Sequence, residues 1–150
     1  MNVLTAMFIS AMNEPEAFWA MQEFMDRAPS YFAPHISGVL KGCELVQKVL
    51  RCVDPEIADA LEKQKMSSKI YAFQDVMSFQ ARRPPIEAAL RLWDVLLAGG
   101  LGMNIIITVS EIINIRDELL SDKKANDVFL EHKDCQNIDK LIEILRNIIA

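Results

Sequence analysis

The 150-residue sequence has few of the residues that interrupt helices or favour strands. It contains only five glycines, and it shows little of the alternation of valine, threonine or tyrosine with polar residues that is typical of strands. This scarcity predicts a helical protein. Because 51% of the residues are apolar and 25% are charged, the composition argues against disorder and fits a single globular domain.

An excess of positive charge is also missing. The formal net charge is −5 at pH 7, whereas binding to nucleic acid requires a basic surface. The densest basic group, Lys63, Lys65 and Lys69 with Arg82 and Arg83 further along the chain, makes a local patch at most. The sequence therefore predicts no nucleic-acid partner.

The cysteine and histidine patterns of disulfide frameworks and metal sites are lacking. Cys43, Cys52 and Cys135 are odd in number and show no CxxC spacing, and His35 and His132 have no neighbouring ligand pattern. On a shared helix, the separation of Cys43 from Cys52 places the two thiols on opposite sides. We therefore predict a reducing compartment, no disulfide, no metal site and no cofactor.

No leader peptide and no membrane span are evident. The apolar run of residues 3–12 has no basic region before it, since the first cationic residue is Arg27, and no clear cleavage site follows. Residues 101–115 are interrupted by polar side chains, and neither run reaches the ~18 uninterrupted apolar residues that a span needs. The sequence predicts a soluble, cytoplasmic protein without an integral membrane segment.

Caps and breakers divide the first half of the chain into helices. Residues 3–12 are predicted to form a buried helix, and Asn13 is predicted to cap the next one. The apolar stripe of that second helix is predicted to contain Phe18, Met21 and Met25, with Trp19 close to it. Residues 28–34 are then predicted to form a loop.

Two further caps follow this loop. Ser37 is predicted to cap a helix that continues to Val53. Asp54 is predicted to cap a short helix that starts with Pro55 and lies on the surface, because its end is charged.

Two prolines separate the next helices. A helix that starts at Ser67 or Ser68 is predicted to run through Phe79 and to end before Pro84, because a proline pair cannot continue a helix. Pro85 can start the following helix, residues 86–98. In that helix Glu87, Arg91 and Asp94 are expected on one stripe, with Arg91 between the two carboxylates.

The last part of the chain is predicted to contain two helices. Residues 103–120 are assigned to a long helix, although their isoleucine-rich run also fits a strand. Asn137 is predicted to cap the final helix, whose apolar residues follow helical spacing up to Ile149.

Motifs for catalysis are lacking. The glycine-rich residues 98–102 follow a helix and have no adjacent Lys-Ser/Thr, so they indicate a turn between helices rather than a phosphate-binding loop. Ser37-Gly38 does not form a GxSxG motif, and the eight methionines are interpreted as core residues. Trp93 is interpreted as a core anchor in the same way.

One set of spacings resembles a known family. Arg82 lies three residues before Pro85, and Leu90 to Asp94 follow with the sequence LRLWD; this spacing resembles the TBC domain, whose members activate Rab-type GTPases. Further similar pieces are EPEAFW at residues 14–19, Ser37-Gly38, Asp54-Pro55 and YAF at residues 71–73. The resemblance covers roughly residues 1–120. Within the family, residues 102–105 and 115–120 are most similar to the fungal spindle-position checkpoint member.

The resemblance implies a fold and an activity. The expected fold is all-α, a bundle of about seven to nine short and medium helices. The expected function is that of a GTPase-activating protein domain for a Rab-family small GTPase, in the cytoplasm and recruited to membranes or spindle poles. Members supply an Arg from an IxxDxxR motif and a Gln from a YxQ motif, and such an Arg accelerates hydrolysis by about 10³–10⁵. Both would precede Met1, so residues 1–150 are expected to be one partial domain without its N-terminal catalytic third.

The resemblance also suggests site residues. It assigns no catalytic residue to the chain, and neither Gln80 nor Arg82 is given a catalytic role. The candidate partner-binding residues are Arg82, Arg91 and Asp94, and the motif or structural residues are Ser37, Gly38, Pro85, Leu90 and Trp93. Arg82 is expected to hold the bend at the two prolines or to pair with a helix C-terminus.

Two alternatives remain beside the activator hypothesis. One is a catalytically silent helical module that binds a GTPase or a scaffold protein in a cell-cycle or membrane-traffic checkpoint complex. The other is an unrelated helical adaptor. Absence of the N-terminal helices of the domain is further expected to expose apolar surface on the helices at residues 3–12 and 103–120, which would favour self-association.

Overall fold

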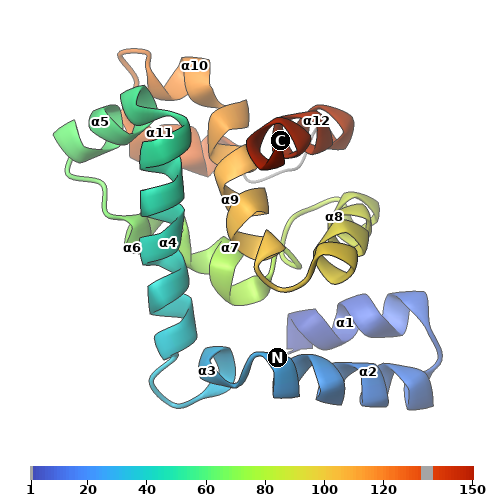
Figure 1. Cartoon of the computed structure of the whole chain (residues 1–150). Helices are drawn as coiled ribbons and strands as arrows, with labels where there is room; N and C mark the ends of the chain where they lie inside the picture. Colours follow the sequence, from blue (N-terminus) through green and yellow to red (C-terminus); the bar gives the residue numbers. More distant parts are fainter. Residues whose placement is uncertain (1, 133–136) are drawn as a thin grey trace.

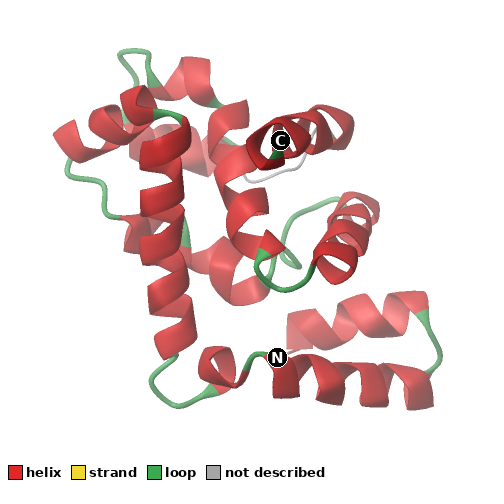
Figure 2. Ribbon diagram, viewed as in Figure 1, coloured by secondary structure: helices red, strands yellow, loops and turns green. Residues whose placement is uncertain are grey.

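The computed structural model describes residues 2–132 and 137–150, and these residues form twelve helices and no strand (Figures 1 and 2). The all-α fold predicted from the sequence is therefore confirmed. Three helices are single turns of four residues, and the other nine are short or medium in length. In chain order the helices are α1 (Asn2–Ala11), α2 (Glu14–Arg27), α3 (Pro29–Phe32), α4 (Ser37–Val53), α5 (Pro55–Lys63), α6 (Ser68–Tyr71), α7 (Phe73–Ser78), α8 (Ile86–Gly99), α9 (Met103–Asn114), α10 (Arg116–Leu119), α11 (Ala125–Glu131) and α12 (Ile138–Ile149).

Local capping explains most helix starts. The side chains of Asn13, Asp54 and Asn137 accept hydrogen bonds from backbone N–H groups three residues later, at 3.1, 3.2 and 3.0 Å. Ser67 caps α6 by accepting from the Lys69 N–H at 3.3 Å. The predicted cap at Ser37 is wrong, because the N-cap position is Ile36, with φ 41°, and it makes no side-chain cap bond.

Several predicted boundaries need correction. Residues 28–34 were expected to be a loop, but Pro29 starts the single turn α3, in accord with its preference for the first helical position. The helix predicted to end at Phe79 is broken at Ala72 into α6 and α7. The predicted helix 103–120 is broken at Ile115, whose N–H bonds to the Ile112 carbonyl in a tighter turn.

Helix α11 was not predicted at all. It has seven residues, too few for a clear apolar period. A tertiary contact helps to define its start, since the Gln64 side chain accepts a hydrogen bond from the Ala125 N–H at 2.8 Å. The sequence between residues 121 and 132 contains no signal for this long-range bond.

Two apolar clusters make up the core, and α9 lies between them. The first joins the antiparallel pair α1–α2 to α8 through Phe8, Phe24 and Trp93, whose rings are 5.3–5.8 Å apart, and α12 adds Leu141 and Leu145 to it. The second lies between α4, α5, α7, α9 and α11. In Figure 1, α4 stands on one side of α9, α8 and α12 on the other, and the α1–α2 pair lies beneath α8.

Helix α2 is rotated relative to the prediction. Its buried residues are Ala17, Met21 and Phe24, which follow an i, i+4, i+7 spacing. Phe18 was expected on the buried stripe, but a side chain one position along a helix points about 100° away from its neighbour. Phe18 is 62% exposed and Trp19 is 69% exposed.

Apolar surface was expected to be exposed on both α1 and α9, but only part of α1 exposes it. Val3 and Ile9 are exposed, whereas Phe8 faces the first cluster. Helix α9 is largely buried because it contacts α4, α7, α8 and α12. Within residues 2–132 and 137–150, no helix has the length and apolar character that crossing a bilayer requires.

Candidate functional site

The bend between α7 and α8 contains Arg82 and Pro85, two of the residues of the family motif. Phe79 and Gln80 both have positive φ values, 50° and 65°, which side chains other than glycine rarely adopt. Two buried hydrogen bonds fix this bend. The Trp93 Nε1–H donates to the Phe79 carbonyl at 2.7 Å, and the Gln80 Nε2–H donates to Thr108 Oγ1 at 2.8 Å. Trp93 is thus a core anchor, as predicted.

Three other motif residues contribute to the packing and the start of helices. Pro85, in a cis peptide bond with Pro84, occupies the N-cap position of α8. Leu90 is half-buried against the first cluster. Gly38 lies where α4 meets α3, and an added Cβ would meet the Tyr31 ring at 2.6 Å and the Ser30 backbone at 2.9 Å. Ser37 beside it is the exposed first residue of α4.

A partly buried arginine, Arg83, holds the proline bend to the rest of the domain. Arg83 Nη2 lies 2.7 Å from Asp75 Oδ2 and 2.9 Å from Glu111 Oε2, and its Nη1 donates to the His132 carbonyl at 3.1 Å. Arg83 therefore links α7, α9 and the end of α11. The expectation that Arg82 holds the bend was wrong by one residue, since Arg82 is exposed.

Glu111 is the buried member of this network. Its side chain is 8% exposed, and burial raises the pKa of its carboxyl to about 8, although the Arg83 guanidinium acts in the opposite direction and Asp75 adds to the rise. A feature of the sequence could have identified this site. Glu111 is the single ionisable residue of α9, in the middle of an isoleucine-rich run.

A cavity of about 690 Å³ adjoins this network. Arg82 lies on its wall together with Arg83, and so do Tyr71 and Phe129, whose rings stack with centroids 5.4 Å apart. Burial raises the pKa of the Tyr71 hydroxyl to about 12. Because Arg83 is bound to three acceptors, its chemical role here is to join helices.

The remaining candidate residues lie on the outer face of α8. Arg91 and Asp94 are both exposed. Glu87, Arg91 and Asp94 keep their i, i+4, i+7 spacing along the single helix α8, and the Arg91 Nη2 pairs with Asp139 Oδ1 of α12 at 2.7 Å. The structure therefore brings Arg91 next to α12 and leaves Arg82 on the cavity wall, so the three candidate charges do not form one cluster.

One acidic group resembles a metal site in its spacing. Donor atoms of Glu118, Glu131 and His132 lie within 4.8 Å of one another. The Lys123 ammonium lies 3.3 Å from Glu118 and 3.2 Å from Glu131, and His132 Nε2 lies 2.7 Å from Glu118. An ion-pair network therefore accounts for this group without a metal ion.

The two cysteines of α4 lie on opposite faces, as their spacing predicted. Cys43 is buried, Cys52 is exposed, and both are free thiols. Cys135 lies outside the described residues.

Comparison with known proteins gives a consistent result. The model of the Rab-GTPase-TBC domain matches residues 1–121. The chain is 33% identical over 121 residues to the putative mitotic check point protein BUB2 of Dictyostelium discoideum, covering 80% of this chain and 33% of that protein. It is 32% identical over 126 residues to cell division control protein 16 of Schizosaccharomyces pombe, covering 80% and 41%.

A more distant relative carries the same domain name. TBC1 domain family member 17 of Homo sapiens is 27% identical over 133 residues, which cover 87% of this chain and 20% of that protein. The chain thus spans less than half the length of each of these relatives.

Proposed function

We propose that this chain, which belongs to the Rab-GTPase-TBC domain family, acts as the GTPase-docking part of a GTPase-activating protein for a Rab-family small GTPase. The single observation that carries the proposal is the family match over residues 1–121, which includes the RLWD helix and the bend before it. The 150 residues contain neither an IxxDxxR nor a YxQ motif. The Arg and Gln that accelerate hydrolysis in the family would therefore come from another segment, and this stretch would constitute a partial domain.

The geometry of α8 supports a docking role. Leu92 and Trp93 of the motif are buried and hold the helix in place, so its outward residues have fixed positions. Asp94 is exposed and forms no ion pair with any other described residue, and Arg91 is held in place by Asp139. We assign partner contacts to Arg91 and Asp94 on α8 and to Arg82 at the bend.

The proposal is tested by separating binding from catalysis. Purified chain is titrated into a panel of Rab-family GTPases loaded with a non-hydrolysable GTP analogue, and GTP hydrolysis is measured in parallel. We expect saturable binding to at least one GTPase and no increase in the hydrolysis rate. Asp94→Lys should weaken this binding by about tenfold, because reversing an exposed contact charge costs roughly 1 kcal/mol or more.

A matched variant controls for surface charge in general. Asp122→Lys reverses an exposed carboxylate on the loop after α10 and should leave binding unchanged. A clear rate increase by the chain alone would contradict the docking role, and no binding to any member of the panel would contradict the GTPase partner.

A second function is supported by the names of the relatives. Two of them are described as a mitotic check point protein and a cell division control protein. We therefore keep the alternative of a catalytically silent module that binds a scaffold protein in a cell-cycle checkpoint complex. In either function we expect the protein in the cytoplasm, recruited to membranes or spindle poles by its partners. The full-length protein is purified from cells by an affinity tag, and its bound partners are identified by mass spectrometry. This distinguishes a GTPase partner from a scaffold protein.

A further inference from the structure

The interior of the cavity beside the Arg83 network has no part in the docking function proposed above. Its volume of about 690 Å³ lies within the range of small-molecule sites, roughly 300–1,000 Å³. Its walls come from α6 and α7, from the bend after α7, from α9 and α10, and from α11 and the start of α12. Phe129, Leu130 and Lys140 of these walls lie beyond residues 1–121, which match the family model. Membership of the family therefore does not account for the cavity.

Part of the wall is apolar. The rings of Tyr71 and Phe129 stack there with an interplanar angle of 7°. Ile70 and Leu130, each next in sequence to one of these rings, also line the cavity and are 59% and 54% exposed. A ligand with a flat apolar body would cover this surface and remove it from water.

Two other residues of the wall have buried polar atoms without a protein partner. Oε1 of Glu111 and Oδ1 of Asn114 form no hydrogen bond with any described residue, and the Glu111 side chain is only 8% exposed. An unsatisfied buried polar group is costly, so such atoms normally contact an ordered water or a ligand. They favour a ligand that carries an N–H or O–H group.

The carboxylates of the wall are already compensated. Asp75 pairs with Arg83 at 2.7 Å, and Glu118 pairs with Lys123 at 3.3 Å. Burial raises the pKa of the Glu111 carboxyl to about 8, which favours its neutral form at neutral pH. These carboxyl groups therefore give little net opposition to a negatively charged ligand.

Two cations of the wall are available to such a ligand. Arg82 lines the cavity from the bend and Lys140 from the first turn of α12, and both are exposed. Neither side chain forms an ion pair with another described residue. The charged part of the wall thus has an excess of positive charge, which attracts an anion.

We propose that this cavity binds a small organic anion with a flat apolar body and a hydrogen-bond donor. Lys140 and Arg82 attract its charged group, and the apolar wall around Tyr71 and Phe129 covers its body. Because Arg82 is shared with the GTPase contacts proposed above, the test leaves it unchanged. GTPase binding should be the same with and without the Lys140 substitution described below, so the two proposals can fail separately.

The probe is 8-anilinonaphthalene-1-sulfonate, which combines two aromatic groups, one N–H and one sulfonate. The matched ligand is N-phenyl-1-naphthylamine, the same molecule without the sulfonate. Both fluoresce more strongly when they leave water, so their affinities follow from titration with the protein at its natural length. We expect saturable binding of both probes.

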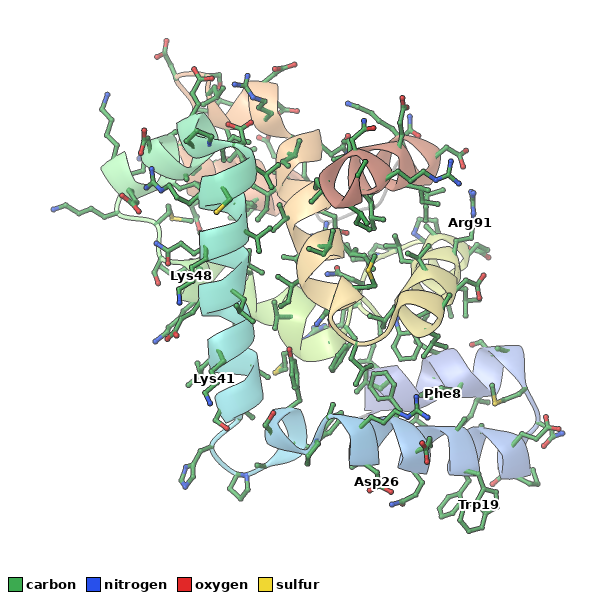
Figure 3. The ribbon with its side chains drawn as sticks, in the orientation of Figure 1. Phe8, Trp19, Asp26, Lys41, Lys48 and Arg91 are labelled. Atoms are coloured by element: carbon green, nitrogen blue, oxygen red, sulfur yellow. The ribbon has the colours of Figure 1, made fainter. Side chains whose placement is uncertain are left out.

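Variants assign this binding to the cavity. Lys140→Glu should weaken binding of the sulfonate probe by about tenfold and leave the neutral probe unchanged, because repulsion replaces attraction. Leu130→Gln should weaken binding of both probes, because it removes apolar surface from the wall. Lys48→Glu makes the same charge reversal on α4, outside the cavity (Figure 3), and should change neither affinity. All three positions are exposed, so the variants should unfold at similar temperatures.

Four results would overturn the proposal. Equal weakening of both probes by Lys140→Glu would contradict an anion contact. Equal effects of Lys140→Glu and Lys48→Glu would assign the binding to net charge alone. Affinities that neither cavity variant changes would place the probes on apolar surface elsewhere. If neither probe binds, the cavity is closed to such ligands in solution.

Discussion

Truncating Trp93 should destabilise the whole domain, because this side chain combines two structural roles. It is 4% exposed, and its ring lies 5.3 Å from that of Phe8 and 5.4 Å from that of Phe24, so it joins α8 to the α1–α2 pair. Its Nε1–H also donates to the carbonyl of Phe79, a residue with a positive φ. Removing the ring takes away both the packing and the partner of that buried carbonyl.

The expected magnitude follows from these two contributions. Core Trp→Ala substitutions cost about 3–5 kcal/mol, and an unsatisfied buried carbonyl costs about 1–3 kcal/mol. The Trp93→Ala total is thus comparable to the roughly 5–15 kcal/mol by which a domain is stable, so this variant should be largely unfolded. Trp93→Phe keeps a ring and loses the hydrogen bond, and it should cost about 1–3 kcal/mol.

The assay is guanidinium unfolding followed by circular dichroism, with Trp19→Ala as the matched control. Trp19 is 69% exposed, so the same substitution there should change the free energy of unfolding by no more than about 0.5 kcal/mol. A Trp93→Ala protein that stays folded and only loses GTPase binding would refute this reasoning. It would place Trp93 at an interface instead of in the core.

Three further predictions concern the proline bend and the α3–α4 contact. Arg83→Met should cost about 3–5 kcal/mol in chemical unfolding because the buried Glu111 and the partly buried Asp75 lose their guanidinium partner, whereas Arg82→Met should be nearly neutral; equal effects would contradict the ion network. The Glu111 carboxyl has a pKa near 8 when folded and an ordinary one when unfolded, so it contributes stability fully below about pH 4.5 and loses that contribution as pH rises through about 8. Glu111→Gln should remove this part of the pH dependence of unfolding, and an unchanged profile would show that Glu111 is ionised in the folded protein. Gly38→Ala should lower the melting temperature because of backbone overlap with α3, whereas Gly102→Ala, in open space, should not; similar melting temperatures would contradict the close approach.

The helical fold and most helix starts could be predicted from the sequence because their causes are local. Asn13, Asp54 and Asn137 bond to groups three residues away, so the sequence places donor and acceptor together without any tertiary contact. The burial of Trp93 could be predicted for a related reason, since its apolar neighbours on α8 identify the inward face. The family was predictable because its motif spacing is a property of the chain itself.

What could not be predicted depends on pairs far apart in the chain. Arg83 rather than Arg82 joins the helices because only Arg83 faces Glu111, 28 residues away, and the carbonyl of His132. The pairing of Arg91 with Asp139 spans 48 residues in the same way.

The exposed Phe18 and Trp19 show the same division between sequence and structure. The sequence determined that α2 is amphipathic, but two apolar stripes about 100° apart were available to it. Packing against Phe8 and Phe79 decided between them, because it buried Phe24 and left the Phe18–Trp19 pair outside. Local hydrogen bonds and spacing therefore determined which segments are helices. Only the tertiary structure decided which face of each helix is covered, because burial is a property of the contacts between distant segments.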